Sequence, residues 1–252
     1  MGQRGGGAAF MPSKVVFPGG ALDPEDRSLA EQILSGAASG DLDPRLWREA
    51  QGDLETGAPA ADAPDGPVLG LSLALSAIRE TFEETGLRLG RAALSPEEMR
   101  SADAARELGG DWAAFSVAGD AASAPKPEAL GYFFRAITPP TKSRRFDARF
   151  FVAFAGDLMG DVDDFSGASG ELGGLAWIPL SRAADYDLPF ITQIVIAELQ
   201  AVAALCAETA ASNDPDQGLS QMASAMRRRP VPFFRHRKDP SQTSLRPVFE
   251  AV

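Results

Sequence analysis

Apolar and polar residues recur along the chain with two different periods, and these periods predict helices and strands in separate segments. Apolar residues recur at helical spacing over residues 71–85 and 190–211, while short apolar runs predict strands at 14–17, 129–137, 145–156 and 172–178. The Ser-Pro-Glu-Glu start at residues 95–98 adds a helix over 96–108. Strands interleaved with helices predict an α/β sandwich with a mixed sheet.

Some of these elements carry signals for their boundaries and their burial. Ser72 is a candidate N-cap for the first long helix, and Gly86 is a candidate for its left-handed C-cap. The run over residues 149–154 is largely apolar, which is typical of a buried strand. The closing helix has one apolar face, made of Ile191, Ile194, Val195, Leu199, Val202 and Cys206. Cys206 is therefore expected in the core and not as a nucleophile.

Composition narrows the classes of function. The chain has 252 residues, a net charge of −11 and one histidine, His236. The negative charge argues against general nucleic-acid binding, and a single histidine excludes a zinc site built from histidines. No apolar run approaches the length of a membrane span, and the N-terminus lacks the apolar core of a signal peptide. One cysteine leaves no internal disulfide, so a cytoplasmic location is expected.

Residues 79–87, Arg-Glu-Thr-Phe-Glu-Glu-Thr-Gly-Leu, are the most informative stretch. Glu80, Glu83 and Glu84 occupy positions i, i+3 and i+4, which share one face of a helix. Carboxylates so close repel one another unless a positive group lies between them, and a hard divalent cation suits that place. A solvated acidic face is the simpler alternative. The flanking apolar residues and the glycine stop instead indicate the end of a packed helix, on which Arg79 can fix a neighbouring carboxylate.

This stretch resembles the second half of the Nudix hydrolase signature, which is Arg-Glu-apolar-any-Glu-Glu-any-Gly-apolar, with Thr81 in the apolar slot. The first half is not adjacent. A Phe-Pro-Gly-Gly run at residues 17–20 precedes Asp26, which stands in the glutamate slot, and 52 residues instead of seven separate Asp26 from Arg79. The split resembles a subgroup that includes the mammalian peroxisomal coenzyme A diphosphatase and bacterial relatives. The Arg-Phe-Asp segment at 145–147 and the stretch from Glu171 to the Trp-Ile-Pro at 177–179 resemble it too.

Residues 27–70 then form an insert within the box. The insert is rich in Ala, Asp, Gly and Pro, and it is predicted to be loop except for a short helix at 44–49. Packing is expected only around Leu42, Leu46 and Trp47. Because the insert leaves the chain between the two halves of the box, its base is expected beside the site, as a lid or as a neutral insertion.

The resemblance implies a Nudix-type α/β/α sandwich that hydrolyses a diphosphate linked to a nucleoside. Glu80, Glu83 and Glu84 would ligate Mg²⁺ or Mn²⁺, and which of them acts as general base stays open, as does any metal role of Asp26. Arg79 would orient a carboxylate.

Further roles concern the substrate. Gly19 and Gly20 would let the backbone approach the site, while Arg145 and Arg149, with Arg144 as a further candidate, would contact a substrate phosphate. The subgroup implies coenzyme A or an acyl-coenzyme A as substrate, with ADP-ribose, NADH and dinucleoside polyphosphates as competitors.

The two ends of the chain give separate expectations. Residues 1–4 resemble the end of a strand that relatives carry deeper inside, so Met1 is suspected to be an internal methionine and a first strand to be missing. Residues 227–252 hold seven Lys or Arg and two acidic residues, and they follow an expected hydrolase domain at 1–226. This segment is either a flap on substrate phosphates or a basic tail along the acidic body. The tail is favoured because unstructured basic ends are common.

Other classes of protein stay open. A Nudix-like domain can keep the fold without the chemistry and serve as a binding or regulatory module, and an N-terminally truncated chain would be an inactive fragment. The expected partner is a small nucleoside diphosphate derivative, with no nucleic acid and no membrane, and a homodimer is left open.

Overall fold

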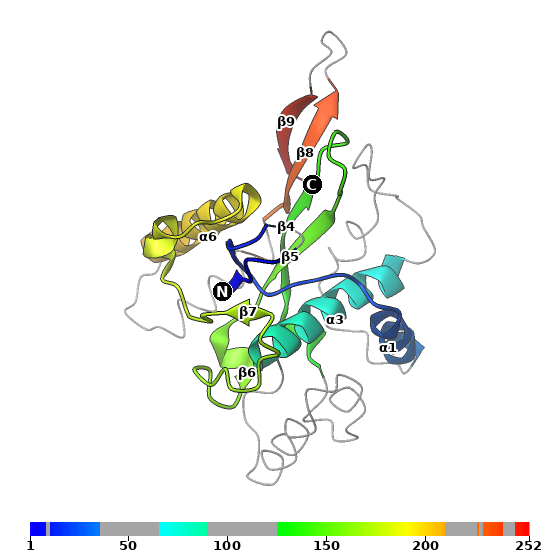
Figure 1. Cartoon of the computed structure of the whole chain (residues 1–252). Coiled ribbons are helices and arrows are strands. Elements are labelled where there is room, and N and C mark those ends of the chain that lie inside the picture. Colours follow the sequence, from blue (N-terminus) through cyan, green and yellow to red (C-terminus); the bar gives the residue numbers. More distant parts are fainter. Residues whose placement is uncertain are drawn as a thin grey trace.

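The computed structural model describes residues 1–8, 11–35, 66–89, 125–209, 226, 229–238 and 245–251, and Figure 1 shows how their elements are arranged. The α-helices are α1 (Pro24–Ser35), α3 (Gly66–Thr85) and α6 (Phe190–Thr209), and the 3-10 helices are η2 (Pro127–Ala129), η3 (Ala155–Asp157) and η4 (Leu180–Asp185). The strands are β1 (Gly2–Arg4), β2 (Val15–Val16), β3 (Arg88–Leu89), β4 (Gly131–Ile137), β5 (Asp147–Val152), β6 (Leu158–Met159), β7 (Leu172–Gly173), β8 (Pro232–Lys238) and β9 (Leu245–Ala251).

The largest sheet in the described part of the chain is mixed. Its order is β5-β4-β8-β9, in which β4 is antiparallel to β5 and parallel to β8, and β8 is antiparallel to β9. Arg135 of β4 pairs with Arg149 on one side and with Phe233 on the other. Two smaller sheets have the orders β2-β1-β7 and β3-β6.

Helices cover both faces of the mixed sheet (Figure 1). On one face, Leu75 of α3 and Ala30 of α1 pack with Tyr132 of β4. On the other face, Val202 of α6 packs with Phe134 of the same strand. Two apolar layers on opposite sides of one sheet confirm the predicted α/β fold with a mixed sheet.

Helix α3 is longer than predicted. It begins at Gly66 instead of residue 71, and Ser72 lies inside it, where its Oγ donates to the carbonyl oxygen of Val68 at 2.6 Å. Ser72 is therefore not the N-cap. The other end agrees with the prediction, because Gly86 has a φ of 77° and its N–H donates to the carbonyl oxygen of Phe82 at 2.7 Å. This is the left-handed cap that glycine adopts without strain.

The start of the insert is helical where a loop was predicted. Helix α1 has proline at its first position, and the Asp26 carboxylate accepts a hydrogen bond from the N–H of Asp23 at 2.9 Å. Both features favour a helix start. The prediction of poor packing here was wrong, because an apolar face at helical spacing packs against α3. Its residues are Leu29, Ala30, Ile33 and Leu34.

Helices α1 and α3 also carry the insert away from the glutamates. An α-helix rises about 1.5 Å per residue, so Gly66 lies about 20 Å along α3 from Glu80, and Ser35 lies about 14 Å along α1 from Asp26. The first residue of the insert, Arg27, directly follows Asp26, whose carboxylate is bonded to Arg79, so on that side the base of the insert lies beside this group, as expected. The described ends at Ser35 and Gly66 lie farther along the two helices. The predicted helix at 44–49, with Leu42, Leu46 and Trp47, lies outside the described residues, as does the helix predicted over 96–108.

The predicted strands form, but they are shorter. β2, β4, β5 and β7 fall within the ranges 14–17, 129–137, 145–156 and 172–178. β5 is half-buried at the edge of the described sheet, whereas a buried strand was expected. The closing helix is confirmed by α6, in which Cys206 is buried in the apolar layer on β4. None of the described helices is long and apolar enough to span a membrane.

Both ends of the chain take part in sheets. β1 pairs with β2 and β7, which confirms that residues 1–4 contain a strand. β8 lies beside β4, and Phe233 and Phe234 are buried. The favoured interpretation of residues 227–252 as an unstructured tail was wrong for β8 and β9, because apolar residues at 231, 233 and 234 complete the core on both faces of the sheet.

Candidate active site

The turn after β2 places the backbone of Gly19 and Gly20 against two glutamates of α3. The N–H of Gly19 donates to Oε2 of Glu84 at 2.8 Å. A Cβ atom added to Gly20 would lie 2.1 Å from Oε1 of Glu80, so no side chain fits there while the carboxylate keeps its position. The glycine turn and the end of α3 thus lie in contact, although the whole insert separates them in sequence.

Arg79 links helix α3 to Asp26 at the start of α1. Its Nε and Nη2 atoms donate to Oδ1 and Oδ2 of Asp26, both at 3.0 Å. Asp26 is 0% exposed and Arg79 is 5% exposed, so this planar pair is buried. Nη1 of Arg79 donates to Oε1 of Glu80 and to Oε2 of Glu83, again at 3.0 Å each. Asp26 is therefore engaged with a guanidinium, and Arg79 is the positive group between two of the carboxylates.

The Arg79 guanidinium stays charged in this setting. Burial alone would lower its pKa, but the hydrogen bond and charge of Asp26, with the charges of Glu80 and Glu83, raise the pKa of Arg79 above its ordinary value. The carbonyl oxygen of Ala21 accepts a further hydrogen bond from Nη2 at 2.8 Å. This bond ties the segment after the glycine turn to the same side chain.

Glu84 is the most buried of the three glutamates. Burial raises the pKa of Glu84 to about 7, its backbone hydrogen bond opposes this shift, the charges of Glu80 and Glu171 add to it, and Arg4 opposes it. Burial also raises the pKa of Glu80, against the opposing charge of Arg79. Burial is thus the main cause of both shifts, and the charges of neighbouring carboxylates add to them.

Glu171 is a fourth carboxylate of this group, and sequence reasoning did not assign it to the site. It directly precedes β7, its charge acts on Glu80 and Glu84, and Nη2 of Arg4 lies 3.5 Å from its Oε1. The available signal was its place in the segment that resembles the family, ahead of Trp177. The fold returns this segment to the glutamates, because β7 pairs with β1 and the N–H of Ser169 donates to the carbonyl oxygen of Glu83 at 2.8 Å.

The two arginines predicted to bind phosphate have other partners. Nη1 of Arg149 donates to the carbonyl oxygen of Asp147 at 2.9 Å and forms an ion pair with its carboxylate at 3.0 Å. Nε of Arg145 donates to the carbonyl oxygen of Thr138 at 3.4 Å. The hydrogen bonds and ion pairs of the three glutamates include neither arginine. Burial lowers the pKa of Arg149.

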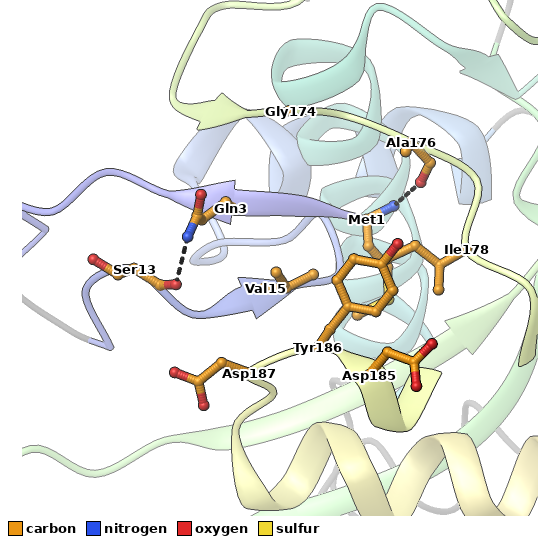
Figure 2. A pocket seen from close by; sticks show the side chains of 10 residues that line it. All are labelled: Met1, Gln3, Ser13, Val15, Gly174, Ala176, Ile178, Asp185, Tyr186 and Asp187. Carbon is orange, nitrogen blue, oxygen red and sulfur yellow. Dashed lines mark hydrogen bonds between the residues drawn. The ribbon is translucent and has the colours of Figure 1, made fainter. Parts of the chain in front are cut away.

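A separate cavity of about 360 Å³ lies over β1 and β2 (Figure 2). Gln3 and Tyr186 line it, and the carboxylate of Asp187 at its rim is paired with Lys14. Side chains alternate along a strand, so Arg4 points to the opposite face of β1 from Gln3. The cavity and the carboxylates therefore lie on opposite faces of β1, with α3 behind the strand in the view of Figure 2.

The carboxylates of Glu80, Glu83 and Glu84 are the type of ligand that a hard divalent cation prefers, but their present arrangement does not form a site for one. Glu80 and Glu83 are hydrogen-bonded to Arg79, and Glu84 to a backbone N–H. No group of three or more His, Cys, Asp or Glu residues within the described ranges is arranged to hold a metal ion. All the candidate ligand atoms are nevertheless carboxylate oxygens, which a hard divalent cation prefers.

No known protein-family profile matches the chain, and no curated protein matches it. Among solved structures, the chain is similar to a NUDIX hydrolase from Alicyclobacillus acidocaldarius. The sequence identity is 27% and the TM-score is 0.45, over 78% of this chain and 80% of that chain.

Proposed function

We propose that this chain is a Nudix-type hydrolase that cuts a diphosphate linked to a nucleoside, with Mg²⁺ or Mn²⁺. The main support is the contact of Gly19 and Gly20 with Glu84 and Glu80, where a turn without side chains lies directly against two carboxylates. Such a contact is expected if the two halves of the split box form one site, as the resemblance implies. Glu80, Glu83 and Glu84 would hold the metal.

The bound cation would polarise the diphosphate, activate water and neutralise charge on the leaving group. Arg79, fixed by Asp26, orients Glu80 and Glu83 through its Nη1 atom. The attacking water must lose a proton to a nearby carboxylate. Glu171 is suited to accept it, because its side chain is 61% exposed and is held by a long contact of 3.5 Å.

Within this class we propose coenzyme A or an acyl-coenzyme A as the substrate, cut to 3′,5′-ADP and a phosphopantetheine. The support is the resemblance of the split box to the coenzyme A diphosphatase subgroup. Contacts of Arg145 and Arg149 add no support, because both are bonded to other groups. We also propose that this protein is located in the cytoplasm.

A second candidate is a Nudix-like binding domain that has lost the chemistry. Arg79 already fills the space between Glu80 and Glu83, and this observation favours a site held together without a metal. The two candidates differ in their response to a cation. An enzyme site is stabilised by Mn²⁺, whereas a degenerate site is not.

The test compares wild type with the double variant Glu83→Gln, Glu84→Gln. Both are incubated with Mg²⁺ and a panel of coenzyme A, ADP-ribose, NADH and dinucleoside polyphosphates, and products are identified by mass spectrometry. We expect turnover in wild type and its loss in the double variant, while Glu25→Gln, an exposed carboxylate on α1, keeps full activity. Turnover that survives the double change contradicts the proposal. A wild-type melting temperature that ignores Mn²⁺ supports the binding domain.

A further inference from the structure

Arg4 is a second guanidinium beside the carboxylates. It is the last residue of β1 and pairs with Leu172 of β7, one residue from Glu171. Its backbone is fixed, because its N–H donates to the carbonyl oxygen of Lys14 at 3.0 Å. Its Nη2 atom lies 3.5 Å from Oε1 of Glu171, and its charge also acts on Glu84.

Arg4 and Arg79 differ in how their donors are used. Every nitrogen of the Arg79 guanidinium already donates, to the carboxylates of Asp26, Glu80 and Glu83. The Arg4 side chain makes no hydrogen bond within the described residues, since its contact with Glu171 is longer than an N–H···O bond. A quarter of it, 24%, is exposed. Its donors can therefore turn to a ligand.

We propose that Arg4 binds a phosphoryl oxygen of the substrate's diphosphate. This inference rests on the proposed function and assigns a substrate-binding residue to that site. A diphosphate is an anion that the carboxylates repel, so its approach requires a cation with free donors. A guanidinium fork matches two phosphate oxygens, and such charge-assisted bonds are short. Arg4 would exchange its long contact with Glu171 for these bonds.

The neighbouring cation of the same hairpin offers a matched control. Lys14 is paired with Asp187 at the cavity of Figure 2, on the opposite face of β1. Removing Lys14 changes the net charge as much as removing Arg4 does. A general electrostatic effect would therefore appear in both variants, whereas a direct contact would appear in Arg4 alone.

The experiment measures the Kd of inorganic diphosphate by titration calorimetry in Mg²⁺, and separately the rise in Tm caused by Mn²⁺ alone. We expect Arg4→Ala to raise the Kd at least tenfold, since a charged hydrogen bond contributes about that much. The Kd of Arg4→Lys should lie between those of wild type and Arg4→Ala, because an ammonium keeps the charge but lacks the planar fork. Lys14→Ala should bind diphosphate as wild type does, and the rise in Tm should be the same in every variant. Arg4→Gln, which keeps the stem, replaces Arg4→Ala if that variant fails to fold.

Three results would overturn the inference. One is an equal Kd in wild type and Arg4→Ala, and another is a wild type that does not bind diphosphate. The third is a parallel loss of the Mn²⁺-induced rise in Tm, because Arg4 would then act through the carboxylates. Failure of the proposed function is seen separately, as absence of turnover on the whole panel. Diphosphate binding that depends on Arg4 would support the inference even in that case.

Discussion

Oε1 of Glu80 lies where the side chain of residue 20 would begin, 2.1 Å from the Cβ position of Gly20. The obstruction is the far end of a flexible side chain. A substituted residue 20 can therefore be accommodated by a swing of the carboxylate, without movement of the backbone. The contact thus links the identity of residue 20 to the position of a proposed metal ligand.

Gly20→Ala is expected to reduce kcat/KM at least tenfold and to change Tm by no more than a few degrees. The methyl group displaces Glu80 from its place, while the fold loses little packing. Kinetics on the best substrate of the panel, with a thermal melt, measure the two effects. Gly7→Ala is the control, since a Cβ there meets nothing within 4 Å. Equal kcat/KM in Gly20→Ala and Gly7→Ala would show that the contact between Gly20 and Glu80 does not affect catalysis.

Asp26→Asn is expected to destabilise the fold by about 1–3 kcal/mol, because it removes the buried charge that accepts Nε and Nη2 of Arg79, while Glu80 and Glu83 still pair with Nη1. Asp26→Glu restores the charge but adds a methylene where the exposed fraction is 0%, so a cost of about 1–3 kcal/mol is expected. Urea unfolding measures both, and the exposed neighbour Glu25→Gln should stay near wild type. An Asp26→Asn variant as stable as wild type would mean that the pair does not hold α1 to α3.

The stability of the metal-free protein is expected to contain a pH-dependent component from Glu84. Its pKa is about 7 in the folded chain and 4.5 in the reference state. Below about pH 4.5 the carboxyl is protonated in both states, and this component favours folding fully. As the pH rises toward 7, the unfolded chain releases its proton and the folded chain keeps it. Stability of the order of 3 kcal/mol is therefore lost over this window.

The measurement is urea unfolding in EDTA from pH 4.5 to 7.5, for wild type and Glu84→Gln. The difference between the two profiles isolates the component of Glu84, which should disappear in the variant. Parallel profiles would contradict the assignment. Mn²⁺ should reverse the trend in wild type, because a cation favours the ionised carboxylate and displaces its proton.

Phe233→Ala is expected to destabilise the fold by about 3–5 kcal/mol. Phe233 is 1% exposed, and the guanidinium groups of Arg135 and Arg235 lie 5.1 and 5.4 Å from its ring centre. Denaturant unfolding gives the value, with Leu205→Ala as a control at a site that is 61% exposed and should change by less than about 0.5 kcal/mol. A small effect at Phe233 would indicate that β8 is not an integral strand of the sheet.

Local features were predicted from the sequence with success. The left-handed cap at Gly86, the apolar face of α6 and the common side of α3 for Glu80 and Glu84 all follow from bonds that reach about four residues along the chain. Such periods can be read without knowledge of the fold. The helical period was missed in α1, because its apolar face consists only of residues 29, 30, 33 and 34.

Only the tertiary structure decided how these elements meet. Arg79 and Asp26 are 53 residues apart in sequence, and they meet because the apolar face of α1 packs on α3. The glycine turn lies against Glu80 because β2, which precedes it, pairs with β1. Glu171 and Arg4 join the group through the pairing of β7 with β1. The sequence determined which residue types were present and which face of a helix they share. The burial of apolar surface between distant elements determined which charges became neighbours, and no local period encodes that choice.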